Sequence, residues 1–118
     1  MSKAMGIPAI GHATCGGHVT LLFTVEDSEI EPYLQGSRGA GLCLDTGCRV
    51  SVRGVHGQWG VNVGFRGFEG SEDIVRGIFD VVSEDLPQIR KMKWDVAVNN
   101  NLPTSQGFGM SAALAIAV

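Results

Sequence analysis

Residues 103–113 spell PTSQGFGMSAA, a glycine-bearing loop that follows an expected strand and leads into an alanine-rich helix start. A helix N-terminus presents unpaired N–H groups and a partial positive charge to an anion. Gly107 and Gly109 let the backbone turn sharply and approach a phosphate without a Cβ in the way. Ser111 adds a hydroxyl of the kind that ligates Mg²⁺. The residues alone fit, and more commonly form, a tight turn into a buried helix that Ser111 caps.

Outward from this loop, hydrophobic periodicity predicts one small α+β or α/β domain. Strands are expected at residues 19–26, 61–65 and 95–99, and a strand pair or bent strand at 42–53 with its turn at Thr46 and Gly47. Helices are expected at 71–86 and 111–118. The first sixteen residues are weakly patterned, so we expect a loosely held arm there.

The helix at 71–86 has the clearest signals. Ser71 is a suitable N-cap, and the two acidic residues after it suit the positive end of the helix dipole. Ile74, Ile78 and Val82 recur at four-residue spacing, which places them on one face. Pro87 marks the end of the helix or the position just beyond it.

Composition excludes several classes of protein. The 118 residues suffice for one domain, and acidic and basic residues are scattered with a net charge of −3, which argues against nucleic acid as a partner. Cys15, Cys43 and Cys48 have no disulfide-framework spacing, so free thiols in a reducing compartment are expected. No signal peptide and no apolar run of about 20 residues is present, which predicts a cytoplasmic protein with no membrane contact.

The last predicted helix is apolar on every side. Residues 112–118 spell AALAIAV, a pattern typical of a helix that is buried all round. A chain end there has no cap for its last carbonyl groups. We therefore expect a homo-oligomer or a separately encoded C-terminal chain to cover Ala112, Ala113, Leu114, Ile116 and Val118.

The phosphate-loop candidate carries a resemblance to a known family. Residues 107–113, GFGMSAA, resemble the second motif of the galactokinase–homoserine kinase–mevalonate kinase (GHMP) superfamily, whose loop wraps the ATP phosphates. Phe108 replaces the usual leucine and Met110 the first serine, which is similar to the archaeal pantoate kinase branch. The resemblance implies ATP and Mg²⁺ as cofactors, with Ser111 beside the metal. The implied ATP-binding residues are Pro103, Gly107, Phe108, Gly109, Met110, Ser111 and Ala112.

Two further patches resemble the same branch, in the same order along the chain. Residues 17–23, GHVTLLF, are similar to its opening motif, although Gly16 and Gly17 stand where the family has a proline. Residues 36–44, GSRGAGLCL, are similar to its Gly-Ser-Arg-Gly-Ala-Gly segment. The substrate-binding residues that the resemblance implies are His18, Thr20, Ser37 and Arg38.

Chemistry alone leaves alternatives open for these residues. The His18 imidazole is of a type that can orient an acceptor, but a backbone-bonded loop histidine fits as well. Arg38 offers a fork for a carboxylate or phosphate, and it also fits an exposed turn. Five His and Cys residues in the first half are of the types that bind zinc; they are His12, Cys15, His18, Cys43 and Cys48. Their spacing matches no common zinc motif.

The resemblance implies a fold and a reaction. Residues 1–118 would be the N-terminal ATP-binding domain, cut short in the helix after the phosphate loop, because family members are more than twice this length. That domain is similar to the second domain of ribosomal protein S5, an α+β fold with a mostly antiparallel sheet, helices on one face and a left-handed βαβ crossover. The implied reaction phosphorylates a small hydroxy acid with ATP, converting pantoate to 4-phosphopantoate in coenzyme A biosynthesis.

Two alternatives to this kinase remain, and no catalytic base is assigned. The first is a non-catalytic half-domain or assembly module of the same fold that needs a separate C-terminal chain. The second is a related synthase that uses a phosphorylated sugar donor and needs no ATP.

Overall fold

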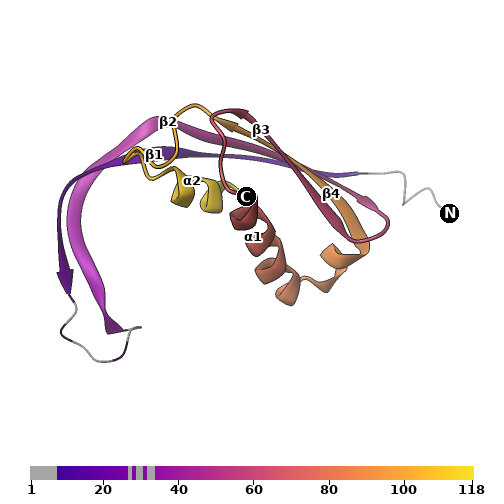
Figure 1. Ribbon diagram of the computed structural model, residues 1–118. Coiled ribbons are helices and arrows are strands. Elements are labelled where there is room, and N and C mark those ends of the chain that lie inside the picture. The colour runs from indigo at the N-terminus through magenta and orange to yellow at the C-terminus, as the bar shows by residue number, and fades with distance from the viewer. Residues whose placement is uncertain (1–7, 27, 29–30, 32–33) are drawn as a thin grey trace.

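The computed structural model describes residues 8–26, 28, 31 and 34–118, whose arrangement is shown in Figure 1. In chain order the elements are β1 (Ala9–Glu26), β2 (Gly36–His56), β3 (Gly60–Gly67), α1 (Glu72–Asp85), the 3₁₀ helix η3 (Pro87–Lys91), β4 (Met92–Asn100) and α2 (Met110–Ala117). The strands form one sheet in the order β1-β2-β4-β3, and α1 and α2 pack on the same face of it. None of the helices in these residues is long and apolar enough to span a membrane.

The sheet is mixed. β1 pairs with β2 and β2 with β4 in antiparallel fashion, whereas β3 and β4 are parallel. Parallel neighbours need a crossover, and α1 provides it between β3 and β4. The predicted α+β class, with a mostly antiparallel sheet and helices on one face, is confirmed. The likeness to the ribosomal S5 domain and the hand of the crossover stay predictions.

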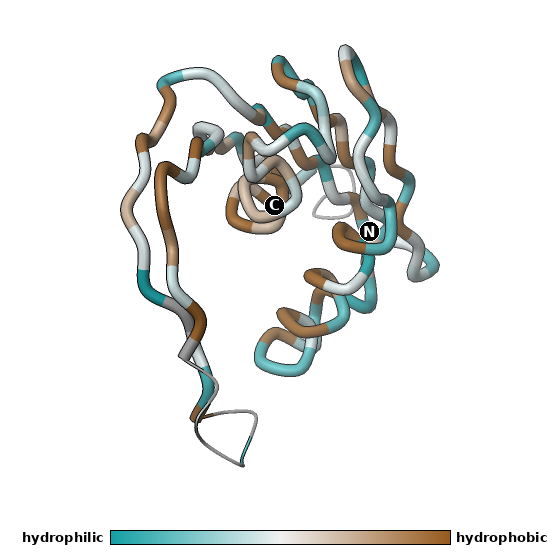
Figure 2. Tube along the Cα trace, turned by 60° about the vertical axis from the view of Figure 1, so that its left-hand side comes forward, coloured by the Kyte–Doolittle hydropathy of each residue, from teal (hydrophilic) through white to brown (hydrophobic). Residues whose placement is uncertain are grey.

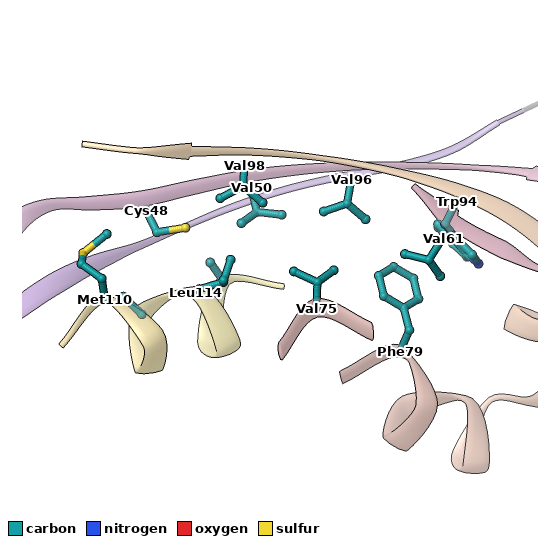
Figure 3. Packing of buried hydrophobic residues seen from close by; sticks show 12 residues of the cluster. Cys48, Val50, Val61, Val75, Phe79, Trp94, Val96, Val98, Met110 and Leu114 are labelled. Carbon is teal, nitrogen blue, oxygen red and sulfur yellow. The ribbon is translucent and has the colours of Figure 1, made fainter. Parts of the chain in front are cut away.

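The core lies between the sheet and the two helices. Alternate residues of β4 are buried, with Trp94, Val96 and Val98 directed toward the helices. Figure 3 shows Val75 and Phe79 of α1 and Leu114 of α2 facing them. The Phe79 and Trp94 ring centroids are 5.5 Å apart. The Trp94 indole N–H donates to the Ile89 carbonyl at 3.1 Å, so the polar end of this large side chain is satisfied inside the core.

β1 and β2 continue past the other strands as a bent two-stranded extension, which we call the outer hairpin (residues 18–26 and 36–43). The register shifts between Gly16 and His18 and again between Thr20 and Leu22. Such irregularities bend a strand and increase its twist. Figure 2 shows hydrophobic residues along both strands of this extension. Its large apolar side chains are exposed; they are Leu21, Leu22, Phe23, Val25 and Leu42.

Two expectations for the first half were wrong. The expected loose arm is not found for residues 9–16, because β1 begins at Ala9 and pairs with β2 along its length, while residues 1–7 lie outside the described residues. The expected turn at Thr46 and Gly47 is absent, because Gly36–His56 form one continuous strand, which matches the bent-strand alternative rather than the strand pair. Gly47 and Gly16 face each other across the two strands, and a Cβ on Gly16 would overlap the Leu44 carbonyl oxygen. These glycines therefore permit close backbone approach rather than a turn.

α2 also differs from expectation, because it is buried on one side and not all round. Ala113, Leu114 and Ala117 are buried against the sheet, whereas Ala112 and Ile116 are exposed. The cause is the two-layer architecture: a helix that lies over a single sheet buries the stripe that faces the sheet. The expected requirement for a partner thus applies to the outer stripe alone.

The two stripes of α2 predict different responses to truncation. Leu114 is 1% exposed and Ile116 is 73% exposed. We expect Leu114→Ala to lower the free energy of unfolding by about 2–5 kcal/mol, because it removes a side chain and leaves a cavity. Ile116→Ala should change it by about 0.5 kcal/mol or less. Urea denaturation of both variants measures the difference, and equal losses would contradict the packing of α2 on the sheet.

The cysteines should differ in reactivity in the same way. Cys48 is buried in the core, and burial raises the pKa of its thiol, with a smaller contribution from the neighbouring Cys15. A raised pKa keeps the thiol protonated to higher pH, and the thiolate is the reactive form. We expect alkylation of the folded chain to modify the exposed Cys43 first and Cys48 last. Peptide mass spectrometry over time measures the order, and denaturation should abolish it.

Candidate functional site

The loop between β4 and α2 has the backbone that its glycines predict. Gly107 and Gly109 have φ of 85° and 62°, and Ser105 joins them at 60°. Gly109 is the N-cap of α2 and, lacking a side chain, makes no capping hydrogen bond. The first N–H groups of a helix have no intrahelical acceptor, so those of Met110 to Ala112 are available to an external one. The loop thus presents a helix N-terminus suited to an anion.

The loop is held against the base of the hairpin. The His18 amide donates to the Phe108 carbonyl at 2.7 Å, and the Asn101 amide donates to the Gly47 carbonyl at 2.9 Å. A Cβ on the buried Gly17 would lie 2.9 Å from the Phe108 carbonyl oxygen. Gly17 therefore has to be a glycine for the loop to approach β1 this closely.

His18 lies beside the loop. A Cβ on Gly109 would lie 3.5 Å from the His18 Cβ, and a Cβ on Gly41 would overlap the imidazole ring. The ring thus covers Gly41, and its Nδ1 is 3.5 Å from the Thr20 hydroxyl. Residues from all three family-like patches, far apart in sequence, therefore meet here.

A pocket of about 330 Å³ lies on the other side of the loop. The residues that line it are Glu69, Gly70, Ser71, Thr104, Ser105, Met110, Ser111 and Leu114. Ser71 is the N-cap of α1 and Met110 is the first residue of α2, so both helices start at this pocket. Ser71 makes no capping hydrogen bond with its side chain. Two helix N-termini and several hydroxyls therefore converge on one polar space.

Most of the residues that line this pocket are not evident from the sequence. Glu69, Thr104 and Ser105 were not among the candidates, and Ser71 was identified only as a helix cap. The segment before α1 is placed by Asn100, which is buried and donates from Nδ2 to the Phe68 carbonyl at 2.9 Å. The Thr104 hydroxyl donates to the Glu69 carbonyl at 3.0 Å and ties the two loops together. These contacts link residues more than thirty positions apart, which local patterns do not reveal.

The remaining predicted substrate residues lie away from the loop. Arg38 pairs with Thr24 on the outer hairpin, whereas His18 pairs with Cys43. Five residues separate Arg38 from Cys43, which corresponds to about 17 Å along a strand. The side chain of Ser37 lies outside the described residues. The structure therefore places His18 beside the loop, with Thr20 next to His18, and leaves Arg38 on the extension.

The zinc arrangement is not formed among the described residues, where no group of three His, Cys, Asp or Glu side chains could hold a metal ion. His12 and Cys15 lie on opposite faces of β1. His12 Nδ1 is 2.8 Å from the Ser51 hydroxyl on one face, and Cys15 packs against the core on the other. Trp94 packs in the core, and Trp59 lies beside the core with Arg90 over its ring.

Solved structures share this fold. A phosphotransferase related to the coenzyme A biosynthesis pathway superposes with a TM-score of 0.61 and 27% identity, over 91% of this chain and 36% of that one. A mevalonate kinase from methicillin-resistant Staphylococcus aureus MRSA252 superposes with a TM-score of 0.51 and 20% identity, over 92% of this chain and 36% of that one. The chain folds like part of each of these two proteins.

The similarity to the two solved proteins is a similarity of structure, and it covers only part of each of them. No protein-family model matches the sequence, and no curated protein matches it. The chain spans about a third of the length of the two phosphotransferases, at 36% of each. Their phosphotransferase chemistry supports the resemblance that the sequence motifs carry.

The left-handed backbone at the N-cap of α2 gives a testable prediction. Gly109→Ala should destabilise the chain by about 1–2 kcal/mol, because an L-residue is strained at a φ of 62°. Gly77→Ala is the matched control, since Gly77 lies within α1, an added Cβ there meets nothing within 4 Å, and alanine favours a helix by up to about 1 kcal/mol. Thermal denaturation should shift in opposite directions for the two variants. A Gly109→Ala variant as stable as the parent would refute the assigned loop conformation.

Proposed function

We propose that the chain is the nucleotide-binding part of a small-molecule kinase that transfers a phosphoryl group from ATP to a hydroxyl of a small hydroxy acid, with pantoate as the substrate and 4-phosphopantoate as the product. One observation carries the proposal: α1 and α2 both start at a pocket lined by the hydroxyl-bearing residues Ser71, Thr104, Ser105 and Ser111. That arrangement suits a phosphate chain better than a neutral or cationic ligand. The phosphotransferase neighbours support it.

Each part of the loop has a role in this proposal. The N–H groups of Gly107 to Ala112 donate to the phosphate oxygens, and the absence of a Cβ on both glycines keeps the approach open. A Cβ on Gly107 would meet nothing within 4 Å, so the space above this residue is free of other protein atoms. Pro103 shapes the entry to the loop. Catalysis of this kind depends mainly on position and on stabilisation of charge.

The pocket also fits a magnesium ion. Hydroxyl-bearing residues and one carboxylate residue line it; they are Ser71, Thr104, Ser105, Ser111 and Glu69. Mg²⁺ prefers oxygen ligands together with phosphate oxygens. When bound, the ion neutralises charge on the transferred phosphoryl group. Ser111 in the first turn of α2 is the ligand that we assign.

The acceptor side is built on β1. His18 is half-buried beside the loop, where it is placed to orient an acceptor hydroxyl or carboxylate. Thr20 follows it on the same strand. Ser37 and Arg38 contribute from the outer hairpin if the acceptor extends along it. Their separation from the loop makes this the least direct part of the assignment.

Activity is proposed for an assembly rather than for an isolated copy. The chain corresponds to 36% of each neighbouring structure. A second copy or a separately encoded C-terminal chain would supply the remaining surface of the substrate site. The second candidate function is a non-catalytic module on the same fold, and the exposed apolar side chains of the outer hairpin, such as Leu22 and Phe23, favour it as a docking surface. ATP turnover by the chain with its partner separates the two, because a module of this kind binds without turnover.

Ser111 tests the nucleotide site. Ser111→Ala should weaken Mg·ATP binding about tenfold or more, because one oxygen ligand of the metal is lost, while folding is little changed because alanine suits a helix. Ser111→Thr keeps the hydroxyl and is the matched control. Titration calorimetry with and without Mg²⁺ measures the effect, alongside thermal denaturation. If Ser111→Ala binds Mg·ATP as the parent does, the metal assignment is wrong.

A further inference from the structure

The face of the sheet opposite the helices carries an unusual row of side chains. Arg49 on β2 pairs with Asn99 on β4, and Asn99 pairs with Arg66 on β3. Residues that are directly paired across neighbouring strands project on the same face. The neighbouring residues Cys48, Val98 and Phe65 face the core, so this row projects away from the helices. Figure 1 shows both helices on the other side of the sheet.

Charge is segregated onto this open face. The chain has a net charge of −3, yet four basic residues lie here; they are Arg49, Arg53, Arg66 and Lys93. Asp95 is the acidic residue among them, and its carboxylate already accepts from Asn62 Nδ2 at 3.3 Å. Asp45, the next acid along β2, lies beyond the part that pairs with β4. Within the described residues, the ion pairs involve Arg76 and Arg90, and neither Arg49 nor Arg66.

Next to the arginine row the surface is hollowed. The next row consists of Ser51, Ala97 and Gly64, which have small side chains or none. A Cβ on Gly64 would meet nothing within 4 Å. The resulting hollow measures about 530 Å³, and Arg49, Arg66, Asn99 and the small residues are among those that line it. Its size is that of a small-molecule site, which typically spans about 300–1,000 Å³.

We propose that this hollow, which we call the arginine hollow (Arg49, Ser51, Gly64, Arg66, Ala97 and Asn99), binds a small molecule that carries phosphate or carboxylate groups. Two guanidinium groups flank the Asn99 amide from strands two spacings apart, about 10 Å. Guanidinium groups match both kinds of anion with paired hydrogen bonds. The small residues Ser51, Gly64 and Ala97 leave space for the rest of the ligand next to the two guanidinium groups.

This site is separate from the one proposed for ATP. The phosphate loop and both helix N-termini lie on the helix side of the sheet, and the arginine hollow lies on the other. The inference therefore does not depend on the proposed function. A small anion fits the hollow better than a nucleic acid does, because the four basic residues cover a short patch on a chain of net negative charge.

Amide chemical-shift mapping of the intact chain tests the proposal at low ionic strength, where exposed charges are least screened. Inorganic pyrophosphate and citrate are the two probes, so that phosphate and carboxylate recognition are compared. We expect saturable shifts for Gly64, Arg66, Ala97 and Asn99 with at least one probe. Arg49→Gln and Arg66→Gln should each weaken this binding about tenfold or more, because each removes a charge-assisted pair of hydrogen bonds.

Two further variants make the result specific. Gly64→Val fills the hollow from a position where a Cβ meets no other atom, so it should abolish the shifts and leave the fold intact. Arg90→Gln removes the same charge near Trp59, away from the sheet face, and should change the affinity less than twofold. Circular dichroism confirms that each variant is folded.

Several outcomes would overturn the proposal, among them the absence of shifts on the open face and equal losses for Arg90→Gln and Arg66→Gln. Unchanged binding by Gly64→Val would overturn it too, as would tighter binding of a short oligonucleotide than of either probe at the same residues. Shifts confined to residues 107–111 would also overturn it, because the probe would then occupy the phosphate loop alone. That last result would leave the proposed kinase function standing.

Discussion

The hydrogen bond from the His18 amide to the Phe108 carbonyl, 2.7 Å long, joins the two halves of the candidate site. It is possible because Gly17 has no Cβ to hold the loop away, and because Gly16 and Gly47 let β1 and β2 approach closely just before it. With the loop fixed there, Gly109 enters α2 through a left-handed turn and Leu114 reaches the core. The direction of the α2 N-terminus therefore follows from the close packing of a few glycines.

Because side chains alternate along each strand, the two faces of the sheet carry different kinds of residues. On β4, Trp94, Val96 and Val98 face the helices, while Asp95, Ala97 and Asn99 face outward. The inner face is closed by α1 and α2, so its polar groups must be satisfied within the protein, as the Trp94 indole is. The outer face has no such requirement and retains arginines without ion pairs among the described residues. The two proposed anion sites thus differ in the groups that they offer: backbone N–H groups at the helix starts, and guanidinium groups on the open sheet.

Local patterns predicted the second half of the chain well and the first half poorly. The helix expected at 71–86 and the strands at 61–65 and 95–99 are present, because their periodicity reflects contact with one core. The sequence predicted a turn at Gly47, but this glycine instead lets β1 approach β2 closely, and β1 is distant from it in sequence. The same limit hid Glu69 and Thr104, which meet Ser111 only after β3 and β4 pair in parallel. The sharp turn at Gly107 and Gly109 could be predicted because it depends on neighbouring residues of one short segment. The pocket lining could not, because it combines segments that are distant in sequence.

In the proposed kinase site, the described residues form most of the phosphate side and only part of the acceptor side. The loop, its anchors at Gly17 and Asn101, and the wall before α1 all come from described residues and are held by hydrogen bonds of about ordinary length. The acceptor side begins at His18 and then follows the outer hairpin, where Leu22 and Phe23 are more than half exposed. Positioning of an acceptor within a fraction of an ångström needs rigid support on several sides. In the proposed kinase, the described residues would therefore supply the groups that bind phosphate, whereas selection of the acceptor would need surface beyond the outer hairpin.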